Sequence, residues 1–393
     1  MAWNWQLADW PNFSWRRERF RRSEDAFLLG AGRLQGIAQR LGLIEHDDML
    51  AQVMSDEAVS TSRIEGETVV PEAVLRSIRL RLGLDHGDDV SGPAERGVSQ
   101  MSVEVRKDFA EPLTAEALGH WHECLLTASQ GALDVRHRIE NIGRYRTHTE
   151  PMQVVSSRAD KTRVYFEAPP SACVSSEMAR FVDWYNGESK EDPAVTRAAL
   201  AHLYFVSVHP YEDGNGRIGR AVAEKTLLQA MGQDTILSLS PVILNRRSDY
   251  YGALQAAQSS NDVEGWVAWF TGIVIEALHR TEAQILFTVD KAEMMNRLNG
   301  QLNGRQEKAL LRMFDEGPKG FDGGMSADKY NSITHAPHST VTRDLGDLVA
   351  KGALYRTGEL KHARYHLAVM LRATPRVTVD EDGQLQSAAH APQ

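Results

Sequence analysis

Apolar residues recur three and four positions apart along most of this chain of 393 residues, and no other feature constrains the fold as strongly. This spacing places apolar side chains on one face of an α-helix. It marks helical segments at 24–73, 115–130, 174–185, 195–208, 217–231, 248–258 and 263–290. We therefore expect a mainly α fold in which amphipathic helices share a buried core.

One segment in the middle of the chain has a different pattern. Residues 152–155 and 163–166 are rich in β-branched and aromatic residues, a polar connection lies between them, and two prolines end the second run. β-branched and aromatic residues fit a pleated strand, and a short polar connection suits a turn. A β-hairpin between helices is predicted.

A smaller unit follows Asn303-Gly304. It contains helical patterns at 306–314, 327–333 and 339–351, and then two short β-like runs that end at residue 367. This order resembles a winged helix. We expect four regions in the chain: a helical N-terminal region at 1–95, a central core at 96–290, the winged-helix-like unit at 291–373 and a disordered polar tail at 374–393.

Charge and cysteine content exclude several classes of protein. The chain has 44 Lys and Arg residues against 53 Asp and Glu residues, and a net charge of −9 argues against a protein that coats phosphate backbones. Two cysteines, Cys124 and Cys173, are too few for a disulfide scaffold. The N-terminus lacks the pattern of a signal peptide, and no apolar stretch approaches the roughly 20 residues of a spanning helix. We expect a cytoplasmic protein without a membrane segment.

The stretch from His209 to Arg220, HPYEDGNGRIGR, collects unlike functional groups in one loop and the start of the next helix. The proline after His209 disfavours the α conformation there, so the preceding helix ends and the imidazole, a potential base, faces the loop. Gly214 and Gly216 let backbone N–H groups approach an anion at the N-terminus of a helix. A phosphate is the natural occupant of such a site.

Three further side chains of this stretch extend the phosphate interpretation. Asp213 offers a hard oxygen ligand for Mg²⁺, and Arg217 and Arg220 lie three apart on one helical face, where each can bind a phosphate. The alternative is an ordinary turn followed by solvated arginines. We favour a site for a metal-bound triphosphate with a general base, because a turn gives no reason to combine these residues in this order.

This stretch resembles the signature of the Fic family, H-x-F-x-[DE]-G-N-G-R-x-x-R, except that Tyr211 stands where phenylalanine is usual. The resemblance implies a helical core with a β-hairpin flap, and in most members the transfer of AMP from ATP to a target hydroxyl. It implies that His209 is the base, that Asp213 binds Mg²⁺, and that Asn215 with the backbone of Gly214 and Gly216 stabilises the α-phosphate. By the same resemblance, Arg217 and Arg220 would bind the outer phosphates.

Other segments resemble secondary features of the family. Thr61 to Gly66, TSRIEG, is similar to the inhibitory motif [ST]-x-x-x-E-[GN], which implies that Glu65 pairs with Arg220. Tyr250 and Tyr251 are similar to a tyrosine pair that borders the adenine, although Gln258 replaces an asparagine often found nearby.

The predicted hairpin is similar to the flap that docks a target segment as an added strand, with Val154 and Val155 at its edge.

Two further patterns bear on the binding of a metal ion and of DNA. His120 and His122 lie two apart on a predicted helix, so they point to different faces and do not share a metal ion. In the C-terminal unit, the helix at 339–351 has the position of a recognition helix, but only Arg343 and Lys351 are basic on it. We favour protein docking or a homodimer for this unit over DNA contact.

The leading hypothesis is a protein adenylyltransferase that uses ATP and Mg²⁺ to modify a Tyr, Thr or Ser hydroxyl of a target protein and is autoinhibited by Glu65. Two alternatives remain open. One is a DNA-binding regulator that senses a nucleotide without catalysis. The other is a Fic enzyme that removes AMP or transfers another nucleotidyl or phosphoryl group.

Overall fold

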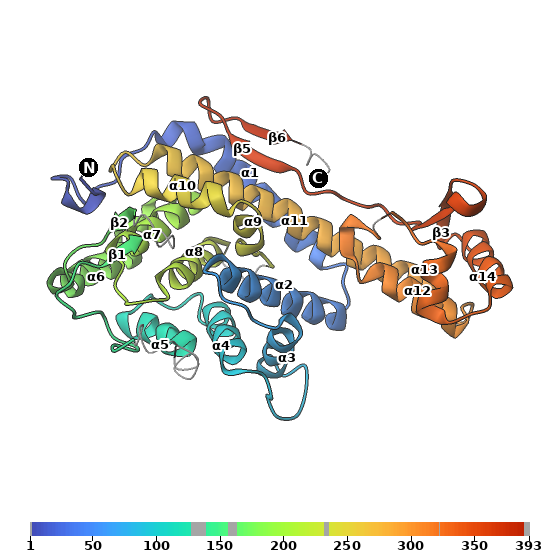
Figure 1. Cartoon of the computed structure of the whole chain (residues 1–393). Coiled ribbons are helices and arrows are strands. Elements are labelled where there is room, and N and C mark those ends of the chain that lie inside the picture. Colours follow the sequence, from blue (N-terminus) through green and yellow to red (C-terminus); the bar gives the residue numbers. More distant parts are fainter. Residues whose placement is uncertain (1, 127–138, 156–162, 232–235, 322, 389–393) are drawn as a thin grey trace. The chain divides into compact units, whose positions relative to one another are not determined.

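The computed structural model describes residues 2–126, 139–155, 163–231, 236–321 and 323–388. Helices make up most of this part of the chain, which confirms the expected mainly α fold (Figure 1). The helices of the N-terminal half are α1 (Arg17–Ala38), α2 (Leu43–Ile64), α3 (Pro71–Arg81), α4 (Pro93–Lys107), α5 (Ala115–Leu126), α6 (Ser171–Asn186) and α7 (Ala194–Val208). Those that follow are α8 (Asn215–Met231), α9 (Ser240–Asn245), α10 (Arg247–Ala257), α11 (Glu264–Arg297), α12 (Gly304–Phe314), α13 (Ala327–Thr334) and α14 (His338–Ala350).

The strands of the described residues form three separate antiparallel pairs. They are β1 (Gln153–Val155) with β2 (Val164–Glu167), β3 (Leu354–Thr357) with β4 (Arg364–Leu367), and β5 (Arg376–Val379) with β6 (Leu385–Ala388). The first pair confirms the predicted hairpin between helices, although its connection, 156–162, lies outside the described residues.

The chain divides into two compact units. The larger unit comprises residues 1–33, 50–278 and 376–388, and the smaller unit comprises residues 34–49, 279–375 and 389–393. The division within the central region falls at His279, inside α11, rather than at the predicted residue 290. A long amphipathic helix can serve the cores of two units, so its sequence pattern gives no sign of the boundary.

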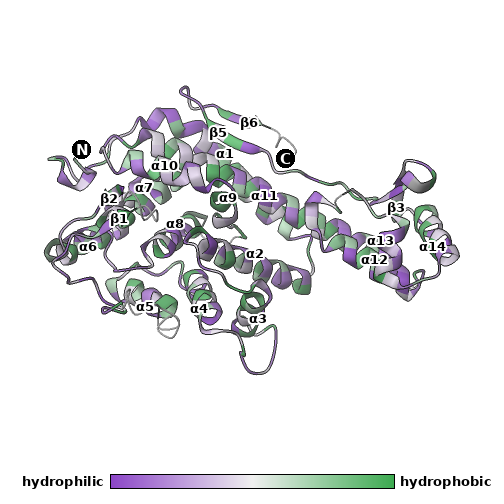
Figure 2. Cartoon of the chain, in the orientation of Figure 1, coloured by the Kyte–Doolittle hydropathy of each residue, from purple (hydrophilic) through white to green (hydrophobic). Residues whose placement is uncertain are grey.

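The core of the larger unit is centred on α7, whose residues are buried along its whole length. A helix that is buried on all sides needs apolar or small residues on every face, and α7 supplies them in the run LAHLYFVSV. Helices nearer the surface carry polar and apolar residues together, as Figure 2 shows by the mixture of purple and green on each. Helix α8 packs directly on α7, so the loop that joins them lies over the core of this unit.

The smaller unit contains α12, α13 and α14, followed by the β3–β4 hairpin, in the order predicted from the sequence. Its core includes Leu310, Met313, Tyr330 and Leu345. The winged-helix assignment, the homodimer and DNA contact stay predictions.

Helices α3, α4 and α9 and the β5–β6 hairpin were not predicted. Helix α3 lies mostly beyond the predicted helical segment at 24–73, α4 begins within a stretch rich in charge and glycine, and α9 is only 6 residues long. For the hairpin, the predicted disordered tail at 374–393 is wrong at residues 376–388. Arg-Val-Thr-Val alternates like a strand and Asp382-Gly383 is a turn signal, so the local pattern for a hairpin was present.

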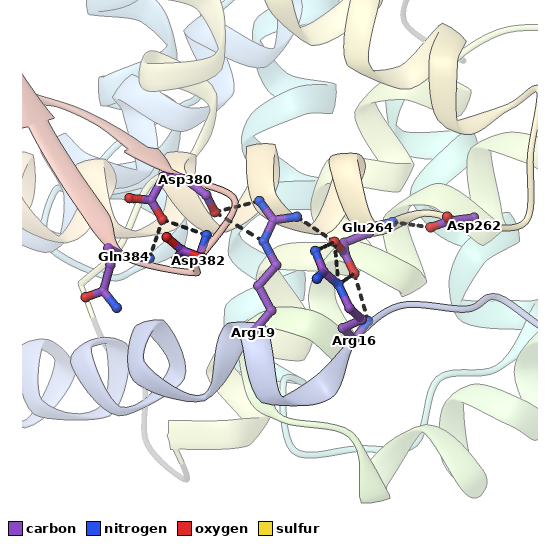
Figure 3. A network of polar contacts seen from close by, with 7 residues as sticks. All are labelled: Arg16, Arg19, Asp262, Glu264, Asp380, Asp382 and Gln384. Atoms are coloured by element: carbon purple, nitrogen blue, oxygen red, sulfur yellow. Dashed lines mark hydrogen bonds and ion pairs between the residues drawn. The ribbon is translucent and has the colours of Figure 1, made fainter.

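Contacts with other elements of the larger unit hold this C-terminal hairpin. Arg19 donates to the carbonyl oxygen of Asp380, with Nη2 at 2.6 Å, and also pairs with Glu264 at 2.7 Å (Figure 3). Val377 is fully buried, donates to Glu276 at 3.1 Å and accepts from Arg246 at 3.0 Å. Partners distant in sequence therefore order this polar segment, and the amino-acid composition of the segment does not reveal such partners.

Within the described residues, no helix is both long enough and apolar enough to cross a membrane.

Candidate active site

The loop between α7 and α8 carries the candidate base. Helix α7 ends at Val208, and His209 follows it in the left-handed conformation with φ 51° and ψ 60°. Its Nδ1 donates a hydrogen bond to the carbonyl oxygen of Val206 at 3.3 Å, so Nε2 is the nitrogen that can accept a proton. Burial and the Arg146 guanidinium disfavour the imidazolium and lower the pKa of His209 to about 4. The imidazole is therefore neutral at physiological pH.

Arg146 holds the backbone on which His209 sits. Its guanidinium donates to the carbonyl oxygens of His209 at 2.8 Å and of Pro169 at 2.5 Å, and its own N–H donates to Pro210 at 2.9 Å. Arg146 is almost fully buried, and burial lowers its pKa to about 10. The sequence reasoning missed this residue, because no motif links a lone arginine to a loop 63 positions away.

Asn215 fixes the shape of the loop from inside. Its Oδ1 accepts from the backbone N–H of Tyr211 at 3.0 Å, and its Nδ2 donates to the carbonyl oxygen of Tyr211 at 2.8 Å. Both ends of the amide are thus used within the protein, and Gly214 completes the turn with φ 80°. The predicted contact of Asn215 with an α-phosphate stays a prediction.

Tyr211, the residue that departs from the usual phenylalanine, lies fully buried under the loop. Its ring stacks on that of His122, with centroids 4.1 Å apart, and its hydroxyl has no hydrogen-bond partner among the described residues. The hydroxyl of neighbouring Tyr145 also has none there. Burial lowers the pKa of His122 to about 4, so its ring packs as a neutral group. Sequence reasoning missed His122 as part of the loop's support.

Arg217 and Arg220 lie at the start of α8, and both point into the protein. Their side chains are only 2% and 1% exposed, and Arg217 Nη2 and Arg220 Nη1 have no hydrogen-bond partner among the described residues. Buried guanidinium groups with unused donors are strong anion ligands. This finding fits the predicted binding of outer phosphates.

Two carboxylates from the segment that follows α2 pair with these arginines. Glu65 pairs with Arg220 at 2.7 Å, as the inhibitory motif implied, and Thr61 accepts two further hydrogen bonds from Arg220, at its hydroxyl (2.8 Å) and its carbonyl oxygen (3.0 Å). Glu67 forms a short ion pair with Arg217. Sequence reasoning missed Glu67, although it lies two residues after Glu65.

The carboxylate of Glu65 lies where an anion was predicted. A Cβ atom on Gly216 would come within 2.2 Å of Glu65 Oε1, so only glycine allows this approach at the first turn of α8. A carboxylate at a helix N-terminus next to a buried arginine is a stand-in for a phosphate oxygen. The cradle built for an anion therefore holds a side chain of the chain itself.

Asp213 is exposed at the mouth of this cradle. Its Oδ1 accepts from the N–H of Gly214 at 2.6 Å, and its Oδ2 lies 3.8 Å from Arg217 Nη2. One accessible carboxylate next to a phosphate cradle is the donor set with which proteins bind Mg²⁺ on a nucleotide. The residues therefore fit the predicted ion.

The predicted adenine residues differ in accessibility. Tyr250 is buried and shares a hydrogen bond of 3.1 Å with His202 Nε2, whereas Tyr251 is exposed and donates to the carbonyl oxygen of Ile64 at 3.1 Å. Only Tyr251 presents a ring surface on which a base could stack. Its hydroxyl contacts the residue directly before Glu65.

The candidate target edge lies on the β1–β2 hairpin. Val154 and Val155 are exposed, in agreement with an edge strand that can pair with an extended peptide. The N-terminal segment supports β2 from the other strand edge, because Trp3 packs on Phe166 and Trp5 Nε1 donates to the carbonyl oxygen of Glu167 at 2.7 Å.

His120 and His122 do point to different faces of α5, as predicted. His122 is buried under the loop, whereas His120 is exposed.

Comparisons with known proteins agree with this geometry. Residues 112–227 match the model of the Fic/DOC family, and residues 3–84 match that of a domain of unknown function, DUF4172. A protein adenylyltransferase Fic of Culex quinquefasciatus is 27% identical over 218 residues, which are 53% of this chain and 41% of that protein. The Drosophila willistoni protein of the same name is 32% identical over 138 residues, 34% of this chain and 25% of that protein. The chain thus spans about two fifths or less of these relatives.

Solved structures were also compared. A Fic family protein from Desulfovibrio desulfuricans has a TM-score of 0.48 and 21% identity, with 91% of this chain and 98% of that one covered. A Fic domain containing signalling protein from Bacteroides thetaiotaomicron has a TM-score of 0.49 and 18% identity, with coverage of 69% and 97%. The signature stretch, His209 to Arg220, lies within residues 112–227, so the part of the chain that carries the candidate site is the part that matches the Fic/DOC family model.

Proposed function

We propose that the protein is a protein adenylyltransferase that transfers AMP from ATP to a hydroxyl side chain, Tyr, Thr or Ser, of a target protein, and that Glu65 and Glu67 inhibit it. The observation that carries the proposal is the pairing of a neutral, half-buried imidazole on His209 with an anion cradle at Gly216 and Arg220. Base and phosphate site lie on one loop and the first turn of one helix.

The reaction follows from these positions. His209 Nε2 takes the proton of the target hydroxyl, and the hydroxyl oxygen forms a bond to the α-phosphorus of ATP. The bond between this phosphorus and the oxygen that bridges to the β-phosphate breaks, and pyrophosphate leaves with the electron pair. Such a reaction needs little covalent work from the protein and depends on orientation and on charge neutralisation.

The surrounding residues orient the reactants. Arg217 and Arg220 would bind the outer phosphates of ATP, and Tyr251 would border the adenine. Asp213 would hold Mg²⁺, which when bound neutralises the charge of the phosphates. Val154 and Val155 would pair with an extended segment of the target and bring its hydroxyl to His209.

Inhibition acts on the phosphates in this proposal. Glu65 occupies the place of an outer phosphate on Arg220, and Glu67 does so on Arg217. ATP would then bind without both arginines, and its α-phosphate would not lie in line with the attacking hydroxyl. Names of the curated relatives as protein adenylyltransferases support the activity.

The test is incubation with labelled ATP and Mg²⁺, with wild type and His209→Ala compared in parallel. We expect His209→Ala to abolish AMP incorporation and to leave ATP affinity within about threefold, because the imidazole acts on the incoming hydroxyl. Unchanged incorporation by the variant would refute the role of His209. Loss of ATP binding together with turnover would instead place His209 on the nucleotide.

A further inference from the structure

Three potential metal ligands of different chemistry meet where α4 packs against α5. Glu104 lies on α4, and His120 and Cys124 lie four residues apart on α5, so that they share one face of that helix. One ligand atom from each residue lies within 4.8 Å of the other two. His120 Nε2 is 3.1 Å from Glu104 Oε1, and Cys124 Sγ is 3.7 Å from His120 Nε2.

We propose that Glu104, His120 and Cys124 form a binding site for Zn²⁺. Zinc binds Cys, His and carboxylate ligands at about 2.0 to 2.3 Å, and tetrahedral geometry then separates neighbouring ligand atoms by about 3.3 to 3.7 Å. The two distances above fall close to this range, so rotation of side chains on a fixed backbone completes the site. A thiolate with an imidazole selects zinc over Mg²⁺ or Ca²⁺.

Contacts around the three ligands have the arrangement typical of metal sites. His120 Nδ1 lies 3.7 Å from Glu123 Oε2, which is longer than a hydrogen bond, so Glu123 would have to move closer to orient a ligating imidazole. Gln100 Nε2 donates to Glu104 Oε1 at 2.9 Å and holds the carboxylate in place. A hydrogen bond between His120 and Glu104 alone would explain neither the position of Glu123 nor that of Cys124.

The site has three protein ligands, and the His120 side chain is 50% exposed, so solvent reaches it. A water molecule would complete the tetrahedron, as in zinc sites with an open position. Binding replaces the thiol proton of Cys124, which passes to solvent, and no change of oxidation state occurs.

The position of this site on α4 and α5 gives it a consequence for the larger unit. Helix α5 carries His122, on which the signature loop rests through Tyr211, and α4 packs on both α5 and α8. Zinc would therefore brace two helices behind the loop without touching a reactant. The inference goes beyond the proposed activity and does not depend on it.

The test uses tag-free full-length protein, without nucleotide, titrated with Co²⁺ as a spectroscopic probe for zinc. A thiolate ligand gives a sulfur-to-cobalt charge-transfer band, which Zn²⁺ in excess should abolish. We expect one equivalent of Co²⁺ to produce the band in wild type and none to appear in Cys124→Ser. Cys173→Ser is the matched control, because Cys173 is the other cysteine and is exposed on α6.

Competition with a chromophoric chelator gives the affinity for Zn²⁺. We expect His120→Ala and Glu104→Gln each to weaken binding at least about tenfold. Zinc should also raise the melting temperature of wild type and not that of Cys124→Ser, which removes doubt about folding of the variants. A wild type without the cobalt band, or a Cys173→Ser variant that loses it, would overturn the site.

Discussion

The two sides of the signature loop are held in different ways. On the base side, His209 is positioned by the contact of Arg146 with its carbonyl oxygen and by its own bond to Val206, which leaves Nε2 as the proton acceptor. On the phosphate side, Arg217 and Arg220 are held by carboxylates of Glu67 and Glu65. His209 therefore has no carboxylate partner in the described part of the chain, whereas both arginines are paired with carboxylates.

This difference locates the proposed inhibition. Among the described residues, no acidic side chain is hydrogen-bonded to His209, so the proposed inhibition acts on the arginines rather than on the proposed base. The carboxylates take Arg217 Nη1 and Arg220 Nη2, so in this proposal a phosphate reaches only the remaining donors of each guanidinium until the carboxylates leave. The following experiments test whether only the phosphate side limits the rate.

The largest change is expected from Glu65→Gly. It removes the carboxylate from Gly216 and Arg220 and leaves the loop intact, so we expect AMP incorporation to rise at least about tenfold, or roughly 1.4 kcal/mol in the barrier. The measurement is the rate of self-modification with labelled ATP. Arg220→Ala in the same background should erase the gain, because the freed arginine is what the first change supplies.

A Glu65→Gly variant no more active than wild type would contradict inhibition on the phosphate side. In that case the arginines would not limit the rate.

A smaller gain, about threefold, is expected from Glu67→Gln. Burial raises the pKa of Glu67 despite its pairing with Arg217, so burial disfavours the ionised form that pairs with Arg217. Its side chain is 35% exposed, against 28% for Glu65, and it does not lie against Gly216. Rates and the KM for ATP should be compared with those of Glu72→Gln, an exposed control in the first turn of α3.

A gain from Glu67→Gln that equals that from Glu65→Gly would reverse this order. Arg217 would then be the limiting phosphate ligand.

On the base side, Tyr211→Phe should act on stability. Its buried hydroxyl has no partner among the described residues, and its removal should raise the free energy of unfolding by about 1 kcal/mol. Tyr185→Phe is the matched control, because the Tyr185 hydroxyl bonds to Gln229 at 3.2 Å and Thr226 at 3.1 Å. That control should lose about 1 kcal/mol in chemical denaturation. Equal losses in both variants would show that the Tyr211 hydroxyl does help to hold the loop.

The smallest change is expected from pH. With a pKa of about 4, His209 is about 97% neutral at pH 5.5, so kcat/KM of a Glu65→Gly, Glu67→Gln variant should fall less than twofold between pH 7.5 and 5.5. Because the folded pKa is lowered, the acid limb moves toward lower pH. A base with the usual pKa near 6.5 would lose about tenfold over the same range, and such a profile would place the limit on the base side.

Much of this site is local in sequence, and this part could be predicted. His209, Asp213, Gly214, Asn215 and the two arginines fall within twelve positions, and the helix that follows fixes their mutual placement. Helical spacing likewise predicted most helices to within a few residues.

The residues that were missed act across long separations. Arg146 reaches its loop through main-chain carbonyls, which carry no residue identity, and His122 acts through stacking. The sequence analysis considered His120 with His122, at i and i+2, and missed His120 with Cys124, at i and i+4. Glu104, the third member of that cluster, lies on another helix. The C-terminal hairpin was missed because its partners precede it by more than 100 residues.

The carboxylates paired with the two arginines belong to the same polypeptide, in the segment directly after α2. A tethered competitor has an effective concentration in the millimolar range for a short connection, whatever the concentration of the protein. In the proposed inhibition, dilution therefore does not release the arginines, and we expect the specific activity of wild type to be independent of enzyme concentration. Activation requires either a ligand that outcompetes this local concentration or a change that moves the last turn of α2 away from Gly216.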